Sequence, residues 1–147
     1  MKWILMLSLM ITGAPVTDWL TDFETAKQVA TEKNRYILLN FSGSDWCIPC
    51  MRLRKEVFDN EAFKKLADSS LVLLNADFPR NRKNQLSKER KDANDKLAEQ
   101  YNSGGKFPFT VVLTAEGQIV QSWEGYPQNN AADFIQRIKS VCDAYHH

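Results

Sequence analysis

Two cysteines separated by two residues occupy the position that most limits what this chain can fold into. Cys47 and Cys50 belong to the run SDWCIPC, which follows the apolar stretch 36–39 and precedes a stretch typical of a helix. The first turn of a helix favours negative charge because its backbone N–H groups are unpaired, so the Cys47 thiol can ionise below the free value of about 8.5. The spacer puts Cys50 within reach of a mixed disulfide formed on Cys47. The pair can therefore cycle between dithiol and disulfide.

A structural disulfide and half of a metal site are the other interpretations of this pair. A metal site needs further ligands at suitable spacing, and the chain offers only Cys142 and the terminal His146 and His147. A bridge between residues three apart closes so small a loop that it restricts the unfolded chain little. The spacing favours redox chemistry, and we expect neither a metal ion nor a small-molecule cofactor. On the apolar face of the last expected helix, Cys142 is predicted to be a buried small hydrophobe rather than a reactive third thiol.

Three residues in and beside the motif shape its chemistry. Pro49 makes the helix entry rigid and is accepted in a first turn, where its missing N–H would have had no partner. Ile48 gives the thiolate neither charge nor a hydrogen bond, so only the helix terminus and nearby cations are left to lower the pKa of Cys47. Candidate cations are Arg52, Arg54 and Lys55. We expect a moderate depression, which favours a reducing or isomerising role over a strongly oxidising one. Trp46 is either core packing or an apolar platform for a partner chain.

Size and charge limit the classes of function. With 147 residues, 44% of them apolar and 25% charged, the chain suits one compact domain. A formal net charge of +1 gives no field that would attract nucleic acid or an anionic membrane. The sequence also has no arginine-rich arm and no zinc-finger spacing. We therefore exclude nucleic-acid binding.

The first fourteen residues have the pattern of a short export signal. Lys2 gives a positive start, residues 3–11 form an apolar run and residues 12–14 are small or polar. The run is too short to span a bilayer. We expect a signal peptide over 1–14, a periplasmic or otherwise exported domain over 15–147, and no stable membrane insertion after signal removal. The alternative is an N-terminal strand or buried helix of a cytosolic protein.

Apolar periodicity and turn residues predict an alternating order of helices and strands. The expected elements are a helix from a cap at Thr17 or Asp18 to Lys33, a strand over 36–41, a helix from Cys47 to Phe58 with a continuation to Leu66, a strand over 71–76, a helix before Tyr101, strands over 109–114 and 119–123, and a final helix to Tyr145. Strands separated by helices imply crossover connections and a parallel core, to which the final hairpin adds an antiparallel edge. The fold class is α/β, with a mixed central β-sheet flanked by helices on both faces.

The segment from Pro79 to Lys96 is strongly polar, and its basic residues outnumber its acidic ones. An apolar stripe at helical spacing continues through its second half, at Leu86, Ala93 and Leu97. A solvated helix preceded by a loop is the simpler interpretation. A surface that docks a partner is the alternative.

Three features together carry a family resemblance. They are WCIPC after a buried strand, the run FPFTVVLTAEGQIV, and the order of helices and strands. On these the chain resembles the thioredoxin superfamily from about residue 18 to 145, most of all its exported bacterial members. The resemblance implies the thioredoxin fold and a cis bond at Phe107-Pro108 beside the cysteines, where the Phe107 backbone would pair with an extended partner segment. It also implies that Cys47 is the nucleophile and Cys50 the resolving thiol.

Two positions depart from the family pattern. Asn40 stands where thioredoxins usually carry a buried aspartate, and Leu73 where they usually carry a lysine. An asparagine accepts no proton at any relevant pH. Glu56 or water would then have to deprotonate the resolving thiol.

The sequence thus predicts a thiol-disulfide oxidoreductase that reduces or isomerises protein disulfides. Its partners would be protein thiols and disulfides and an unidentified electron donor. A disulfide-forming oxidase of the same fold is one alternative. A non-catalytic module that binds peptides beside Pro108 is the other.

Overall fold

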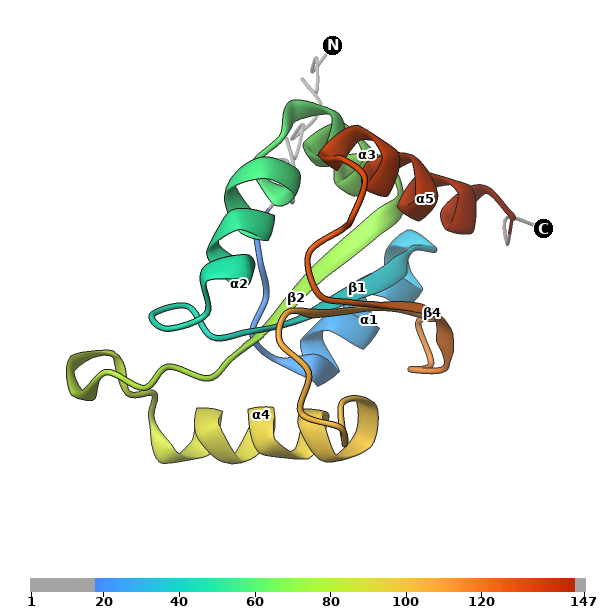
Figure 1. The fold of residues 1–147 in the computed structure, drawn as a ribbon. Coiled ribbons are helices and arrows are strands. Elements are labelled where there is room, and N and C mark those ends of the chain that lie inside the picture. Colours follow the sequence, from blue (N-terminus) through green and yellow to red (C-terminus); the bar gives the residue numbers. More distant parts are fainter. Residues whose placement is uncertain (1–17, 145–147) are drawn as a thin grey trace, which may run out of the picture.

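The structure, a computed structural model, describes residues 18–144. The expected signal peptide, His146 and His147 lie outside these residues. In chain order the elements are α1 (Phe23–Lys33), β1 (Tyr36–Ser42), α2 (Ile48–Leu53), a π-helical turn (Arg54–Phe58), α3 (Glu61–Ser70), β2 (Leu71–Asp77), a short 3₁₀ turn (Arg82–Asn84), α4 (Lys88–Tyr101), β3 (Phe109–Leu113), β4 (Ile119–Glu124) and α5 (Ala131–Ala144) (Figure 1). None of these helices combines the length and the apolar character that a membrane span requires.

The strands form one mixed sheet in the order β2-β1-β3-β4. β1 and β2 are parallel, and β3 and β4 form the expected antiparallel hairpin. β3 runs antiparallel to β1, with Phe41 opposite Phe109, so the antiparallel part of the sheet is larger than predicted. The reason lies after α4, where residues 102–108 carry the chain back toward the end of the sheet that holds the cysteines before β3 begins (Figure 1).

Helices cover both faces of the sheet, as the predicted fold class requires. The alternation of side chains along β1 sends Leu38 to one face and Ile37, Leu39 and Phe41 to the other. The first face is packed by α2, α3 and α5, whose buried residues include Leu53, Phe63, Leu66, Phe134 and Ile138. The second face is packed by α1 and α4, which bury Ala26, Ala30, Leu97 and Tyr101. The helices therefore hold the sheet in the middle of a three-layer molecule.

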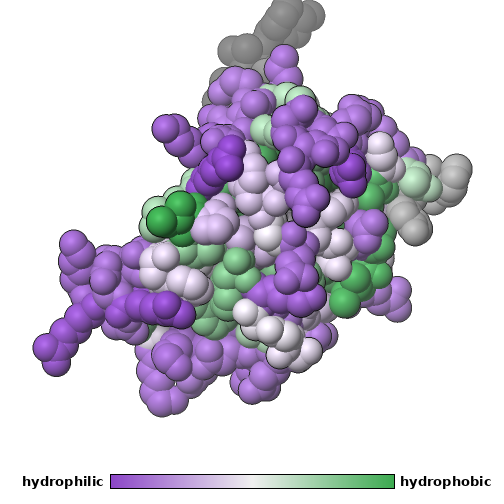
Figure 2. All heavy atoms as spheres, in the orientation of Figure 1, coloured by the Kyte–Doolittle hydropathy of each residue, from purple (hydrophilic) through white to green (hydrophobic). Residues whose placement is uncertain are grey.

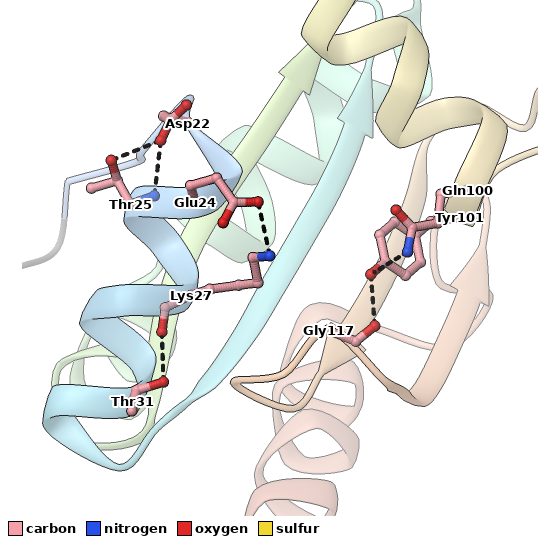
Figure 3. A network of polar contacts seen from close by, with 8 residues as sticks. All are labelled: Asp22, Glu24, Thr25, Lys27, Thr31, Gln100, Tyr101 and Gly117. Atoms are coloured by element: carbon pink, nitrogen blue, oxygen red, sulfur yellow. Dashed lines mark hydrogen bonds and ion pairs between the residues drawn. The ribbon is translucent and has the colours of Figure 1, made fainter.

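The N-cap of the first helix lies four to five residues later than the predicted cap at Thr17 or Asp18. Its N-cap is Asp22, whose carboxylate accepts from the backbone N–H and the hydroxyl of Thr25, both at 2.8 Å (Figure 3). Trp19 and Leu20 are not helical. Leu20 makes a parallel bridge to Leu74, with its N–H donating to the Leu73 carbonyl at 2.8 Å. This segment therefore protects the outer edge of β2.

The Tyr101 side chain joins α4 to the end of the sheet opposite the cysteines. The Tyr101 hydroxyl donates to the Gly117 carbonyl in the turn between β3 and β4, at 2.6 Å (Figure 3). Gly117 has φ +90°, and a Cβ there would come within 2.9 Å of that hydroxyl. Glycine is needed at this turn for both reasons.

Candidate active site

Cys47 and Cys50 form a disulfide at the start of α2, with their Cα atoms 5.2 Å apart. Cys47 is the N-cap of the helix, and the backbone N–H of Cys50 donates to its Sγ at 3.3 Å. Cys50 lies in the first turn. The two residues are only 4% and 5% exposed. The sulfur of Cys47 thus accepts one of the backbone N–H groups that a helix terminus leaves unpaired.

The loop before the cysteines is held by its own backbone and by β2. The Gly43 carbonyl accepts from the N–H groups of Trp46 and Cys47, at 3.3 and 2.9 Å. A Cβ at Gly43 would overlap the Trp46 indole, so the close approach needs glycine. The Asp77 carboxylate, at the end of β2, accepts from the backbone N–H and the hydroxyl of Ser44 at 2.9 and 2.5 Å. The loop is therefore fixed relative to the sheet.

A second carboxylate joins this loop to the chain after β2. Asp45 accepts from the backbone N–H groups of Arg80 and Asn81, both at 2.9 Å, and from the Asn84 amide at 3.0 Å. The N–H of Arg80 contributes most to lowering the pKa of Asp45 below its ordinary value of 3.8, followed by the Asn84 amide. The polar stretch after β2 is thereby fastened beside the cysteine motif.

The structure brings Trp46 and Phe107 together. Their ring centroids are 5.4 Å apart in an edge-to-face arrangement, and the Trp46 Nε1–H donates to the Phe78 carbonyl at 2.7 Å. The Phe107-Pro108 bond is cis, as the resemblance implied, and Pro108 is buried. Trp46 and Phe107 line a hollow together with Phe78, Pro79, Arg80 and Gly105.

The spacer residues point outward. Ile48 is 75% exposed and Pro49 is also exposed, whereas the cysteines on either side are buried. Met51, one turn on, is 43% exposed. In Figure 2 apolar side chains show at the start of α2, above the hydrophilic side chains of the loop that projects at the left. This apolar surface is open to a partner chain.

Two of the three predicted cations after Cys50, Arg52 and Arg54, are engaged elsewhere. Arg52 donates to Glu56 at 3.0 Å and stacks on the Tyr126 ring, while Arg54 pairs with Asp59 and lies over Trp19. The Tyr126 hydroxyl also donates to Glu56. That hydrogen bond, together with the one from Arg52, lowers the pKa of Glu56. Glu56 is therefore a weaker proton acceptor than an ordinary carboxylate.

Asn40 lies in a row of neutral polar groups across the sheet, in which Asn40 and Thr110 are buried and Asn75 is half-buried. Its amide donates to the Asn75 side chain at 3.1 Å, and the Thr110 hydroxyl donates to its oxygen at 3.5 Å. Asn75 and Thr110 are its partners in register on β2 and β3. At the position where thioredoxins usually carry an aspartate, this site has no carboxylate.

Cys142 is fully buried in the apolar cluster beneath α5. Burial raises the pKa of this thiol to about 11. The expected burial of Cys142 is confirmed. Among residues 18–144 there is no group of three or more histidine, cysteine and acidic side chains that could hold a metal ion.

Sequence reasoning missed Asp45, Phe78 and Arg80 as parts of this site. The excess of basic residues after Pro79 was visible, but it does not reveal which side chain faces the cysteine motif. That placement comes from hydrogen bonds to Asp45, which follow no periodicity. No local pattern in the sequence indicates it.

Comparisons with known proteins agree with this geometry. Residues 18–115 match the family described as Thioredoxin-like. Over 119 residues the chain is 30% identical to the "Disulfide bond reductase DsbH" of Chlamydia pneumoniae, covering 81% of this chain and 69% of that protein. A shorter match, 36% identical over 64 residues, is to the "Thioredoxin-related protein DsbJ" of the same organism, covering 44% of this chain and 18% of that protein.

A solved structure titled "DsbH Oxidoreductase" superposes with a TM-score of 0.77 at 26% identity, covering 97% of this chain and 95% of that one. The predicted thioredoxin fold and family are thereby confirmed, together with homology to disulfide oxidoreductases. With its Cys-Ile-Pro-Cys disulfide at the start of α2, this chain belongs to the thioredoxin-like family.

Proposed function

We propose that this chain reduces or isomerises protein disulfides, with Cys47 as the attacking thiol and Cys50 as the resolving thiol. The observation that carries the proposal is the backbone N–H of Cys50 directed at Cys47 Sγ at the N-cap of α2. A hydrogen bond to a sulfur favours its charged form, and the thiolate is the nucleophile in disulfide exchange.

The reaction moves two electrons from the protein to its substrate. The Cys47 thiolate attacks one sulfur of a substrate disulfide, forms a mixed disulfide and expels one substrate thiolate. Cys50 then loses its proton and attacks Cys47 Sγ, which expels the second substrate thiolate and closes the Cys47–Cys50 disulfide. Both substrate sulfurs leave reduced and take up protons. In isomerisation, a different substrate thiolate attacks the substrate sulfur of the mixed disulfide instead, which forms a new substrate disulfide and releases the Cys47 thiolate.

Water is the proton acceptor that we assign to Cys50 in the second step. Asn40 has an amide where thioredoxins usually carry a carboxylic acid. Glu56 accepts hydrogen bonds from Tyr126 and Arg52. Leu73 is buried and also brings no titratable group. Resolution of the mixed disulfide would then depend on solvent reaching Cys50 when the substrate is attached.

A reducing or isomerising direction is supported by the surroundings of Cys47. The exposed Ile48-Pro49 spacer adds no charge, and Arg52 and Arg54 are paired with carboxylates along the helix. Within the motif and α2, the helix terminus is thus the main feature that stabilises the Cys47 thiolate, which suits a reductant. The relative from Chlamydia pneumoniae is also named as a disulfide bond reductase.

The substrate would lie across Trp46 and Phe107. Within the described residues, neither the backbone N–H nor the carbonyl of Phe107 has a hydrogen-bond partner. An extended substrate segment could therefore pair with Phe107 as an added strand, packed on buried Pro108 and on the Trp46 ring. Export remains part of the proposal, because the pattern of residues 1–14 is that of a signal peptide.

A Cys50→Ser variant tests the proposal. Without the resolving thiol, reduced protein mixed with a disulfide-containing protein should accumulate a mixed disulfide through Cys47, visible on non-reducing gels and removed by dithiothreitol. The matched controls are Cys47→Ser and Cys142→Ser. Cys47→Ser should form no adduct. Cys142→Ser keeps the resolving thiol and should release the substrate from the mixed disulfide as the unaltered chain does. Equal adducts from Cys47→Ser and Cys50→Ser, or none from Cys50→Ser, would contradict the assignment and favour a peptide-binding module.

A further inference from the structure

The stretch that follows β2 brings positive charge to the cysteine end of the molecule. We call residues 79–87 the basic loop: it contains Arg80, Arg82 and Lys83 and no acidic residue. All three side chains are exposed. Across residues 18–144, no carboxylate forms an ion pair with any of them. Within the described residues, no salt bridge therefore neutralises these three side chains.

The basic loop has a fixed place beside the site. Asp45 holds the backbone N–H groups of Arg80 and Asn81, and the Gln85 amide donates to the carbonyls of Pro79 and Asn81 at 3.1 and 3.2 Å. These bonds involve backbone groups of the loop, so they leave the basic side chains free to contact a partner. Residues that lie on a fixed loop can discriminate between substrates.

Arg80 is the basic residue of the loop that lines the hollow beside Trp46. Its guanidinium lies 3.7 Å from the centroid of the Trp46 ring, and it lines the hollow with Trp46, Phe78 and Phe107. A guanidinium that stacks on an aromatic face keeps the N–H groups of its edge available for a carboxylate. None of these side-chain N–H groups bonds to a described residue.

The other charges near the hollow are already satisfied. Lys106, next to Phe107, pairs with Glu124 at 2.8 Å. The Asp45 carboxylate accepts from three N–H donors of the basic loop, so both of its oxygens are directed at that loop. Of the described residues that line the hollow, Arg80 is the charged one, and it lies among mostly apolar and aromatic neighbours.

We propose that Arg80 is a specificity-determining residue that favours substrates with an Asp or Glu side chain close to the cysteine that Cys47 attacks. The inference rests on the proposed function. The substrate segment would pack an apolar side chain between Phe78, Trp46 and Phe107 and place its carboxylate against the edge of the Arg80 guanidinium. Arg82 and Lys83 would attract such segments from a distance and raise the rate of encounter.

A series of disulfide-linked peptide homodimers tests the inference. Each peptide carries one Glu, Gln or Lys at a single position within three residues of its cysteine, so both sulfurs of the dimer have the same neighbours. Fully reduced full-length protein is mixed with each dimer in single turnover, and the second-order rate constant is measured. At the best position we expect Glu to react about fivefold to tenfold faster than Lys at low salt, with Gln between them. Salt should shrink this ratio toward one, since the pair is exposed.

Variants of the basic loop assign the preference to one side chain. Arg80→Gln should bring the Glu-to-Lys ratio close to one, and Arg80→Glu should invert it. Both leave the backbone N–H that Asp45 holds. Arg82→Gln is the matched control, because it removes one positive charge from the same loop at a residue outside the hollow. This variant should keep most of the Glu-to-Lys rate ratio.

Equal rates for Glu, Gln and Lys peptides would overturn the inference and leave the proposed function standing. Equal losses of the ratio in Arg80→Gln and Arg82→Gln would also overturn it, because general attraction by the loop would then explain the preference. A failure to reduce any peptide would overturn the proposed function, and this inference with it.

Discussion

At the scale of single residues, the three cysteines differ in what surrounds each sulfur. Cys47 Sγ accepts a backbone N–H at a helix terminus, and Cys50 lies in the turn that provides it. Cys142 is enclosed by apolar side chains beneath α5, and burial raises its pKa to about 11. The surroundings thus stabilise the thiolate of Cys47 and destabilise that of Cys142.

This contrast predicts selective alkylation of the reduced protein. With a pKa of about 11, roughly one Cys142 thiol in a thousand is ionised at pH 8. We expect iodoacetamide to modify Cys47 first in the folded protein and to reach Cys142 only after unfolding in guanidinium chloride. Mass spectrometry of the time course distinguishes the sites. Modification of Cys142 in the folded protein as fast as that of Cys47 would contradict its burial.

Residue types at the motif were readable from the sequence, but their neighbours were not. The run WCIPC and the dipeptide Phe107-Pro108 identified the cysteines and the cis bond because local spacing and a family pattern carry them. Arg80 and Phe78 join the site only through the hydrogen bonds of Asp45 and Trp46 to a distant stretch of chain. Side-chain contacts of this kind leave no local signature in a single sequence.

At the scale of elements, the first helix shows how one apolar pattern can suit two structures. Trp19 and Leu20 fit the helical stripe that continues into α1, and they also suit an extended segment. The hydrogen bonds that Leu20 exchanges with β2 favour the extended form, and Asp22 then caps the helix. Sequence periodicity contains no information on whether the edge of a strand is free to be paired.

Asp22, the observed N-cap of α1, and Asp18, a predicted N-cap, provide a matched test. Asp22→Ala should lower the free energy of unfolding by about 1 kcal/mol, because the helix loses its capping oxygen. Asp18→Ala, at the predicted cap, should change it little. Urea unfolding of the oxidised protein measures both. A larger loss for Asp18→Ala than for Asp22→Ala would mean that the helix begins where the sequence first indicated.

At the scale of the whole molecule, the fold gathers the site at one end of the sheet. The loop before α2, the basic loop after β2 and the segment before β3 all meet there, although they are far apart in the sequence (Figure 1). Layers, helix order and the hairpin could be predicted from periodicity. The direction of β3 could not, because it depends on the path of residues 102–108, which have no regular pattern.

The reduction potential of the Cys47–Cys50 pair is the most direct test of the proposed role. The full-length protein would be equilibrated in glutathione buffers of graded ratio, and its oxidised fraction measured by alkylation and mass shift. The apolar spacer, which adds no charge beside the Cys47 thiolate, leads us to expect a potential below about −180 mV, in the range of reductants and isomerases. A value near about −120 mV, typical of a strong oxidant, would contradict the reducing role.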